Sequence, residues 1–182
     1  MIVAESGGPA VYLDALTAAD CDLVHHWRNQ SARDTLRTPV MLTTEMQAEF
    51  YREIVCNRHS LHRYFAMVDS SAGRRELVAM GGLTNIAWED GITEISLIVD
   101  PQRQRRGIGR AAVQRLLDEA FGRLRLSAVY GEVYQCNPAV DFWRRIVDEH
   151  GGSVVVLPVR KFALGRHWDS LYFTIRAPKD AG

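Results

Sequence analysis

The sequence predicts an α/β (α+β) fold, in which helices pack around one mixed β-sheet. Patterns of period two and period 3.6 alternate along the chain in the order strand, two helices, three strands, helix, strand, helix and two strands. The 182 residues suit one domain with a sizeable core, and no repeat or linker divides them. We therefore expect a single domain over residues 1–182, with its core at 10–176 and flexible ends at 1–9 and 177–182.

The first strand and two helices follow from short patterns near the N-terminus. Residues Val11–Leu16 alternate weakly between apolar and polar side chains, which predicts a strand. Apolar residues then recur at helical spacing, and Thr17 or Asp20 can serve as the N-cap of a helix. The stretch "LTTEMQAEFYREIV" repeats this arrangement with Thr43 or Thr44 as the N-cap. Between the helices, the stretch "RTPVM" is expected to be a loop, because it contains Pro39.

Three strands are expected next, because three runs rich in β-branched and aromatic residues are separated by the turn segments "SAGRRE" and "EDG". These runs cover residues 63–70, 77–88 and 92–100.

The C-terminal half alternates helices and strands. Apolar residues at offsets 0, 3, 4, 7, 8 and 11 from Val113 predict a helix. A strand over 126–136 then leads to Asn137 and Pro138, which we expect to be the N-cap and first residue of a helix that stops at Gly151. The last two strands and their hairpin connection are expected at 153–163, 169–177 and 164–168.

Composition narrows the classes of function. Lys and Arg together number 22, as do Asp and Glu, and this zero net charge disfavours a nucleic-acid-binding protein. No apolar run approaches the ~20 residues that cross a bilayer, and the N-terminus lacks the pattern of a signal peptide. The three cysteines form no CxxC pattern, and His25 and His26 lie on adjacent helix faces that suit a chelate poorly. We therefore expect a cytoplasmic protein with no metal and no membrane contact.

A basic turn stands out against this neutral background. Four arginines and two glycines lie within residues 103–110, which we call the arginine turn, between a β-branched strand and a helix. The first N–H groups of a helix have no internal partner, and the helix dipole adds positive charge there. Gly107 and Gly109 let a ligand approach the backbone closely. These features predict a phosphate or pyrophosphate site. The Walker pattern is absent, and the third glycine of a dinucleotide fingerprint is replaced by Ala112.

The arginine turn carries a family resemblance. The stretch "QRRGIG" from Gln104 to Gly109 matches the Q/R-x-x-G-x-G/A signature of the GNAT superfamily of N-acetyltransferases, and it follows a strand that ends in V-x-P, as in that family. The order of elements agrees over nearly the whole chain. The segments "HHWRN", "GGLTNIAW" and "GRHWDSLYF" resemble one branch, which contains the acetyltransferases of ribosomal-protein N-termini and of amino-sugar nucleotides.

This resemblance implies a single GNAT-like domain with about four helices, whose mixed, mostly antiparallel sheet splays apart at the acyl-CoA site. It implies acetyl-CoA as co-substrate and a primary amine as acceptor. The pyrophosphate would bind the arginine turn, and the pantetheine arm would pair with strand 94–100, where the N–H of Ile98 or Val99 would face the thioester oxygen. The expected cofactor contacts are Ile98, Val99, Gln104, Arg105, Arg106, Gly107, Ile108, Gly109, Arg110, Asn137 and Trp143.

The catalytic candidates follow from the same resemblance. Glu94 is the expected general base, because it lies four residues before Ile98 on the same strand face, and Glu132 is the substitute. The family tyrosine that protonates the leaving thiolate is replaced here by Trp143, whose indole is no practical acid. Tyr134 and Cys136 are the alternative acids. A thiolate stabilised by a helix N-terminus is a further alternative.

Contacts to the acceptor are expected from Arg28, Trp88 and Trp168, with Trp27 and Tyr134 as weaker candidates. The leading acceptor is a small-molecule amine, for which an amino sugar linked to a nucleotide is one candidate. A protein N-terminus is the alternative acceptor, and a non-catalytic acyl-CoA-binding module is the alternative to an enzyme. Nucleic-acid binding by the arginine turn is the least favoured reading. The chain is expected to be a monomer or homodimer.

Overall fold

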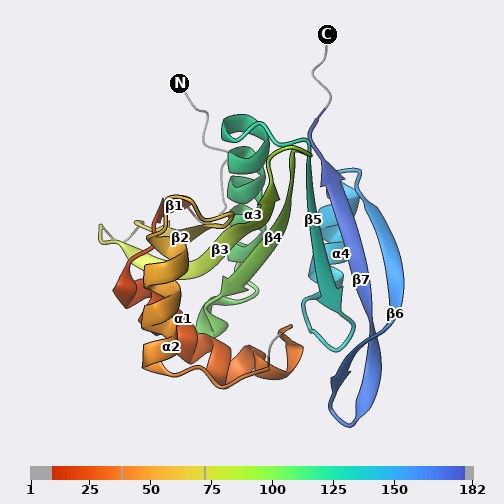
Figure 1. Ribbon diagram of the computed structural model, residues 1–182, viewed down its shortest axis with the longest axis horizontal. Coiled ribbons are helices and arrows are strands. Elements are labelled where there is room, and N and C mark those ends of the chain that lie inside the picture. Colours follow the sequence, from red (N-terminus) through yellow and green to blue (C-terminus); the bar gives the residue numbers. More distant parts are fainter. Residues whose placement is uncertain (1–9, 38, 72, 179–182) are drawn as a thin grey trace.

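The computed structural model describes residues 10–178, apart from 38 and 72, and these form an α/β fold around one mixed sheet (Figure 1). The strand order is β1-β2-β3-β4-β5-β7-β6, and every neighbouring pair is antiparallel except β4 and β5, which are parallel. The strands are β1 Val11–Ala15, β2 Arg63–Asp69, β3 Glu76–Ala87, β4 Ile92–Val99, β5 Ala128–Tyr134, β6 Ser153–Ala163 and β7 Arg166–Arg176. Among the described residues the α-helices are α1 Ala18–Trp27, α2 Thr44–Phe50, α3 Ile108–Leu117 and α4 Val140–Glu149.

The helices cover both faces of the sheet (Figure 1). On one face, α1 and α2 enclose an apolar cluster that includes Val24 and Met80. On the other face, α3 and α4 pack over a larger cluster that joins residues such as Leu83, Leu116 and Phe173. Each central strand therefore presents alternate side chains to two different cores. In the part of the chain that the structure describes, no helix is both long and apolar enough to span a membrane.

Helix α1 begins at a reciprocal capping motif. The Asp20 N–H donates to Thr17 Oγ1 at 3.1 Å, and the Thr17 N–H donates to an Asp20 carboxylate oxygen at 2.8 Å. Both residues that the sequence offered as caps thus take part in one capping box, with Thr17 as the N-cap. Helix α2 begins with a one-sided cap at Thr43, whose hydroxyl accepts the Met46 N–H at 3.2 Å.

The sheet divides between its two parallel strands. β4 and β5 pair only through Ile92–Ala128, Thr93–Val129 and Glu94–Tyr130, although both strands continue beyond these residues. Figure 1 shows the two strands diverging toward their carboxyl ends. The splayed, mostly antiparallel sheet that the family resemblance implied is therefore confirmed.

Two boundaries near the C-terminus differ from expectation. Helix α4 starts at Val140 rather than directly after Asn137, because the Asn137 carbonyl accepts the Val140 N–H in a separate turn. The last hairpin is tighter than the expected connection over residues 164–168, because β7 already begins at Arg166. Leu164 and Gly165 alone form the turn, with φ values of 53° and 77°, and two successive positive values are what a two-residue hairpin turn requires.

Candidate active site

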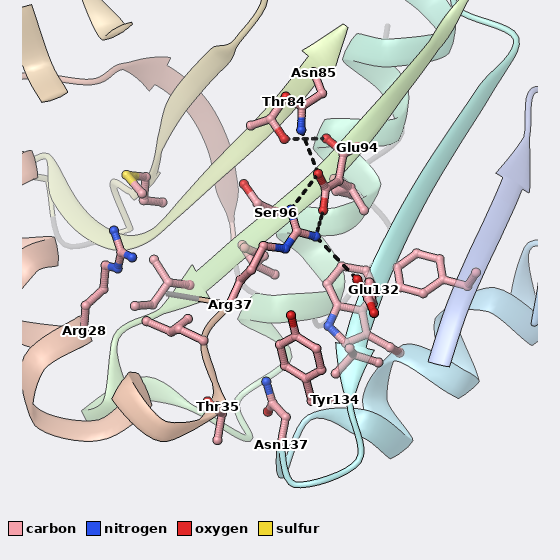
Figure 2. Close-up of a pocket in the computed structure, with 18 of the residues that line it drawn as sticks. Arg28, Thr35, Arg37, Thr84, Asn85, Glu94, Ser96, Glu132, Tyr134 and Asn137 are labelled. Carbon is pink, nitrogen blue, oxygen red and sulfur yellow. Dashed lines mark hydrogen bonds and ion pairs between the residues drawn. The ribbon is translucent and has the colours of Figure 1, made fainter. Parts of the chain in front are cut away.

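A cavity of about 360 Å³ lies where β4 and β5 separate (Figure 2). Strand β4 contributes Glu94 to its wall, β5 contributes Glu132 and Tyr134, and the loop after α1 contributes Thr35 to Arg37. The splay thus creates an open space in the middle of the sheet, lined by polar groups from segments far apart in the sequence.

Strand alternation aims the polar side chains into this cavity. On β4, Ile98 packs with the α1 and α2 cluster, whereas Leu97 and Val99 pack with the α3 cluster. Glu94 shares the parity of Ile98 and therefore faces the α1 and α2 side. On β5, Val129 lies in the α3 cluster, so Glu132 and Tyr134 face the same side as Glu94.

Glu94 is held by donors from two other segments. The guanidinium of Arg37 makes a two-pronged contact with its carboxylate, at 2.5 Å from Nη2 to Oε1 and 3.3 Å from Nη1 to Oε2. The side-chain amide of Asn85 donates to Oε2 at 2.8 Å. The hydrogen bond to Glu94 raises the pKa of Arg37 above its ordinary value. Both carboxylate oxygens of Glu94 are consequently engaged.

Glu132 lies on β5, across the gap from Glu94, and one of its carboxylate oxygens already accepts two hydrogen bonds. Its Oε1 accepts from the Ser170 hydroxyl at 2.7 Å and from Arg160 Nε at 3.0 Å. Its Oε2 lies 3.8 Å from Arg37 Nη2, so the same guanidinium nitrogen stands between the two glutamates. Burial alone would raise the pKa of Glu132, but the hydrogen bonds from Ser170 and Arg160 outweigh it and hold that pKa below its ordinary value.

The two candidates for the acid are placed differently. Tyr134 is 8% exposed, lines the cavity and has the Lys161 ammonium 5.5 Å from its ring centroid. Cys136 is absent from the described lining, and burial raises the pKa of its thiol. Trp143 lines the cavity but stacks on Phe173 at 5.0 Å between ring centroids, which is a packing role.

The open edge of β4 offers backbone amides to the gap. The Asp100 N–H donates to the Val78 carbonyl of β3 at 3.0 Å. Because successive amides of a strand point to opposite sides, the Ile98 amide also points toward β3, whereas those of Leu97 and Val99 point toward the gap. Of the two amides expected from the sequence, Val99 is the suitable donor, and Leu97 is a second one that the sequence reasoning missed.

The arginine turn has the backbone shape of an anion site. Arg105 and Gly107 have φ values of 62° and 79°, and Gly107 is the N-cap of α3. Alternation of left-handed with other residues turns successive N–H groups toward a common point, as in anion-binding nests. Arg103 is paired with Glu76 and Asp100, and Arg110 lies 3.3 Å from Glu149. No carboxylate of the described residues forms an ion pair with Arg105 or Arg106, whose side chains are exposed.

The acceptor candidates from the sequence do not all reach the cavity. Arg28 lines it, and burial lowers the pKa of this arginine. Trp88 is 45% exposed beyond the end of β3, and Trp168 donates its indole N–H to the Ala163 carbonyl at 2.9 Å within the last hairpin. Neither tryptophan is part of the described cavity wall, and Trp27 is 6% exposed in the α1 core.

Two important cations, Arg37 in the cavity wall and Lys161 beside it, were not predicted from the sequence. Arg37 belongs to a segment expected only to be a loop, and Lys161 belongs to a strand expected only to pair with its neighbour. The Lys161 ammonium donates to the Leu36 carbonyl at 2.5 Å and so fixes the loop that presents Arg37. The sequence indicated only the two carboxylates of this group, because Glu94 and Glu132 were expected on neighbouring strands.

A group outside the cavity also departs from expectation. Ligand atoms of Asp22, His25 and His26 on α1 lie within 4.8 Å of one another, so the adjacent histidines approach more closely than their helix positions suggested. Nδ1 of His25 is buried without a hydrogen bond and lies 3.3 Å from Asp22 Oδ1.

Comparison with solved structures identifies the fold. A spermidine N-acetyltransferase from Vibrio cholerae in complex with CoA and spermine superposes with a TM-score of 0.79 at 23% identity, covering 91% of this chain and 95% of that one. A spermidine/spermine N-acetyltransferase from Vibrio cholerae in complex with manganese ions gives a TM-score of 0.74 at 24% identity, covering 91% and 92%. At these identities the likeness concerns the fold.

Comparison with families and curated proteins gives two further results. No curated protein matches the chain. A family profile described as "Acetyltransferase (GNAT) domain" matches residues 10–141, which include the splayed strands, Glu94, the arginine turn and most of the cavity wall. With the profile, the fold and the cavity in agreement, the chain belongs to the GNAT family of N-acetyltransferases.

Proposed function

We propose that this acetyltransferase uses acetyl-CoA to acetylate the primary amine of a small molecule by direct attack in a ternary complex. The observation that carries this proposal is the splay of β4 from β5, which leaves a free strand edge beside a cavity with two carboxylates. A strand edge can pair with an amide-bearing arm, and a carboxylate can take the proton of an amine.

The residues present fit CoA. Gly107 adopts a left-handed conformation, and a Cβ at Gly109 would lie 3.3 Å from the Phe142 ring, so the turn is compact. Backbone N–H groups of residues 105–110, with the side chains of Arg105 and Arg106, would hold the pyrophosphate. Leu97 and Val99 would pair with the pantetheine arm along the gap.

Bound acetyl-CoA would supply an activated thioester, to which the amine would add to form the new N–C bond before the C–S bond breaks and CoA leaves with its sulfur. The amide of Val99 or Leu97 would stabilise negative charge on the thioester oxygen. Glu94 would accept the proton that the amine loses, directly or through a water. Tyr134, whose side chain lines the cavity, would donate a proton to the departing thiolate, and it suits this role better than Cys136.

The positive charge of Arg28 in the cavity wall distinguishes between the classes of acceptor. A nucleotide-linked amino sugar would present phosphates to this arginine, whereas a polyamine, the substrate class named for the structural neighbours, would be repelled by it.

Calorimetry and a CoA-release assay test the function together. We expect purified protein to bind CoA and to release it from acetyl-CoA when the correct member of a panel of amino sugars, sugar nucleotides, polyamines and N-terminal peptides is added. Binding without turnover on every amine would support an acyl-CoA-binding module instead. An absence of heat with both CoA and acetyl-CoA would overturn the proposal.

A single substitution separates the acceptor classes. Arg28→Ala is expected to raise the KM of a phosphate- or carboxylate-bearing amine about tenfold, the value of one charged hydrogen bond, while the KM of a polyamine falls or stays level. Initial rates at saturating acetyl-CoA measure this difference. Equal changes for both classes would remove Arg28 from acceptor recognition.

A further inference from the structure

We propose that Arg37 Nη2 marks the subsite of the acceptor ammonium, and that the acceptor must displace the Arg37 side chain in order to bind. This inference rests on the proposed function and names the cation-binding part of that same cavity. Arg37 is thereby a specificity-determining residue, because it competes with every amine for the same pair of carboxylates.

The two carboxylates form a cation site that spans the splayed strands. Arg37 Nη2 lies 2.5 Å from Glu94 Oε1 and 3.8 Å from Glu132 Oε2, so it stands between groups from β4 and β5 (Figure 2). The side chains of Glu94 and Glu132 are 11% and 9% exposed. Two buried carboxylates that face each other repel unless a cation lies between them or they share a proton, and here the cation is the Arg37 guanidinium. A primary ammonium has the charge and the N–H donors to replace this guanidinium nitrogen.

The other oxygens are already committed, which fixes where the ammonium must bind. Glu132 Oε1 is occupied by Ser170 and Arg160, and Glu94 Oε2 is occupied by Asn85 as well as by Arg37. The pair Glu94 Oε1 and Glu132 Oε2 meets only Arg37 among the contacts of the described residues. An amine held there is also next to the oxygen of Glu94 that takes its proton.

Arg37 can leave this position without unfolding the loop. Its side chain is 57% exposed, whereas the preceding carbonyl, of Leu36, is fixed by the Lys161 ammonium at 2.5 Å. The loop is thus anchored while the guanidinium is within reach of water, so rotation of the side chain alone can vacate the subsite. An amine that binds too weakly to displace Arg37 is rejected.

Steady-state kinetics of Arg37→Ala test the competition. With the best amine of the panel, we expect KM for the amine to fall about tenfold, the value of one charge-assisted hydrogen bond, while the Kd for CoA is unchanged. Arg123→Ala is the matched control, because Arg123 is an exposed arginine that also pairs with a glutamate, Glu119, at 3.5 Å. It should leave both constants unchanged.

A small cation tests the subsite without an acceptor. Methylguanidinium should bind Arg37→Ala about tenfold more tightly than the parent protein, measured by chemical-shift changes, because the empty carboxylate pair recovers its cation. Adding Glu132→Gln to this variant should abolish the gain, since one of the two carboxylates is then neutral. Arg37→Met serves if the alanine variant melts at a lower temperature than the control.

The outcomes separate this inference from the function itself. If Arg37→Ala and Arg37→Met both bind methylguanidinium no better than the parent and keep its KM for the amine, the subsite assignment is overturned, while normal CoA binding and turnover leave the acetyltransferase proposal standing. A rise in the KM for the amine would also overturn it, because Arg37 would then assist the acceptor. Failure to bind CoA would instead count against the proposed function.

Discussion

Glu94 combines two properties that a general base in this cavity needs. It faces the gap between the splayed strands, and the Asn85 amide holds its carboxylate through a 2.8 Å hydrogen bond to Oε2, which does not depend on Arg37. Its position also places it on the strand whose free amides would bind the thioester. Proton transfer and oxygen stabilisation can therefore be supplied from one strand.

The role of Glu94 is open to a direct test. Glu94→Gln keeps the side-chain shape but cannot accept the proton, so we expect kcat to fall about 10²- to 10⁴-fold. Calorimetry should show an unchanged affinity for CoA, since Glu94 lies away from the arginine turn. A variant that keeps the turnover of the parent protein would exclude Glu94 as the base.

The sequence could predict which side chains reach the cavity where strand alternation or a motif sets their position. Glu94, Glu132 and Tyr134 were found in this way, and all three line the cavity. Arg37 could not be found, because its position depends on how a loop after α1 crosses to Glu94, 57 residues later in the chain. Trp88 was nominated because aromatic groups at loop ends often serve binding, but nothing in a sequence shows on which side of a sheet end a loop residue points.

At the scale of elements, the start of α3 depends on Gly107. Its φ of 79° is a left-handed conformation in which a Cβ is strained. Gly107→Ala should lower the free energy of unfolding by about 1–2 kcal/mol and weaken CoA binding, since the N–H groups of the turn move with it. Gly122→Ala is the control, because a Cβ there meets nothing within 4 Å and this glycine has no positive φ. Equal unfolding curves for the two variants would contradict the prediction.

The capping box of α1 gives a prediction with a defined pH dependence. Burial alone would raise the pKa of Asp20, but the hydrogen bonds from Arg75 and Thr17 outweigh it and hold that pKa below its ordinary value of 3.8. A lowered pKa means that the ionised group stabilises the fold above pH 3.8, and that this contribution is lost as the pH falls through the folded-state value.

Substitution of Asp20 should reveal the pH range in which its ionised carboxylate stabilises the fold. Asp20→Ala is expected to lower the free energy of unfolding by about 2 kcal/mol at neutral pH, the scale of hydrogen bonds to a charged group. The difference from the parent protein should shrink below pH 3.8. Urea unfolding at a series of pH values measures it, and Asp118→Ala, a surface carboxylate, should change stability by less than about 0.5 kcal/mol. A gap that persists at low pH would show that packing, rather than charge, is lost.

Element boundaries show where local patterns stop being sufficient. The caps at Thr17 and Thr43 were predictable, because a hydroxyl three residues before a free N–H is a local arrangement. Asn137 has the same local signal, yet the chain makes another turn before α4 begins at Val140. The splay between β4 and β5 has no local signature at all, and only the family resemblance anticipated it.

At the scale of the whole molecule, CoA should act as a stabilising ligand of the folded chain. At a concentration one hundred times its Kd, CoA should raise the melting temperature by about 5–10 °C. Thermal unfolding with and without CoA measures the shift, and adenosine serves as a control without a pyrophosphate. A shift of the same size with adenosine would place CoA binding away from the arginine turn. DNA should not raise the melting temperature by a comparable amount, because the chain has no net positive charge.

The short ladder between β4 and β5 has a mechanical consequence. Among the described residues, the three pairs at Ile92 to Glu94 are the only hydrogen-bonded connection between β4 and β5, so they act as a hinge between the two halves of the sheet. A ligand that binds between β4 and β5 replaces the backbone hydrogen bonds that are missing there. Ligand binding should therefore make the connection between the two halves of the sheet more rigid. This rigidity can set the order of substrate binding. The amine would find Glu94 on β4 and Glu132 on β5 well positioned only after acetyl-CoA has bound between the two strands.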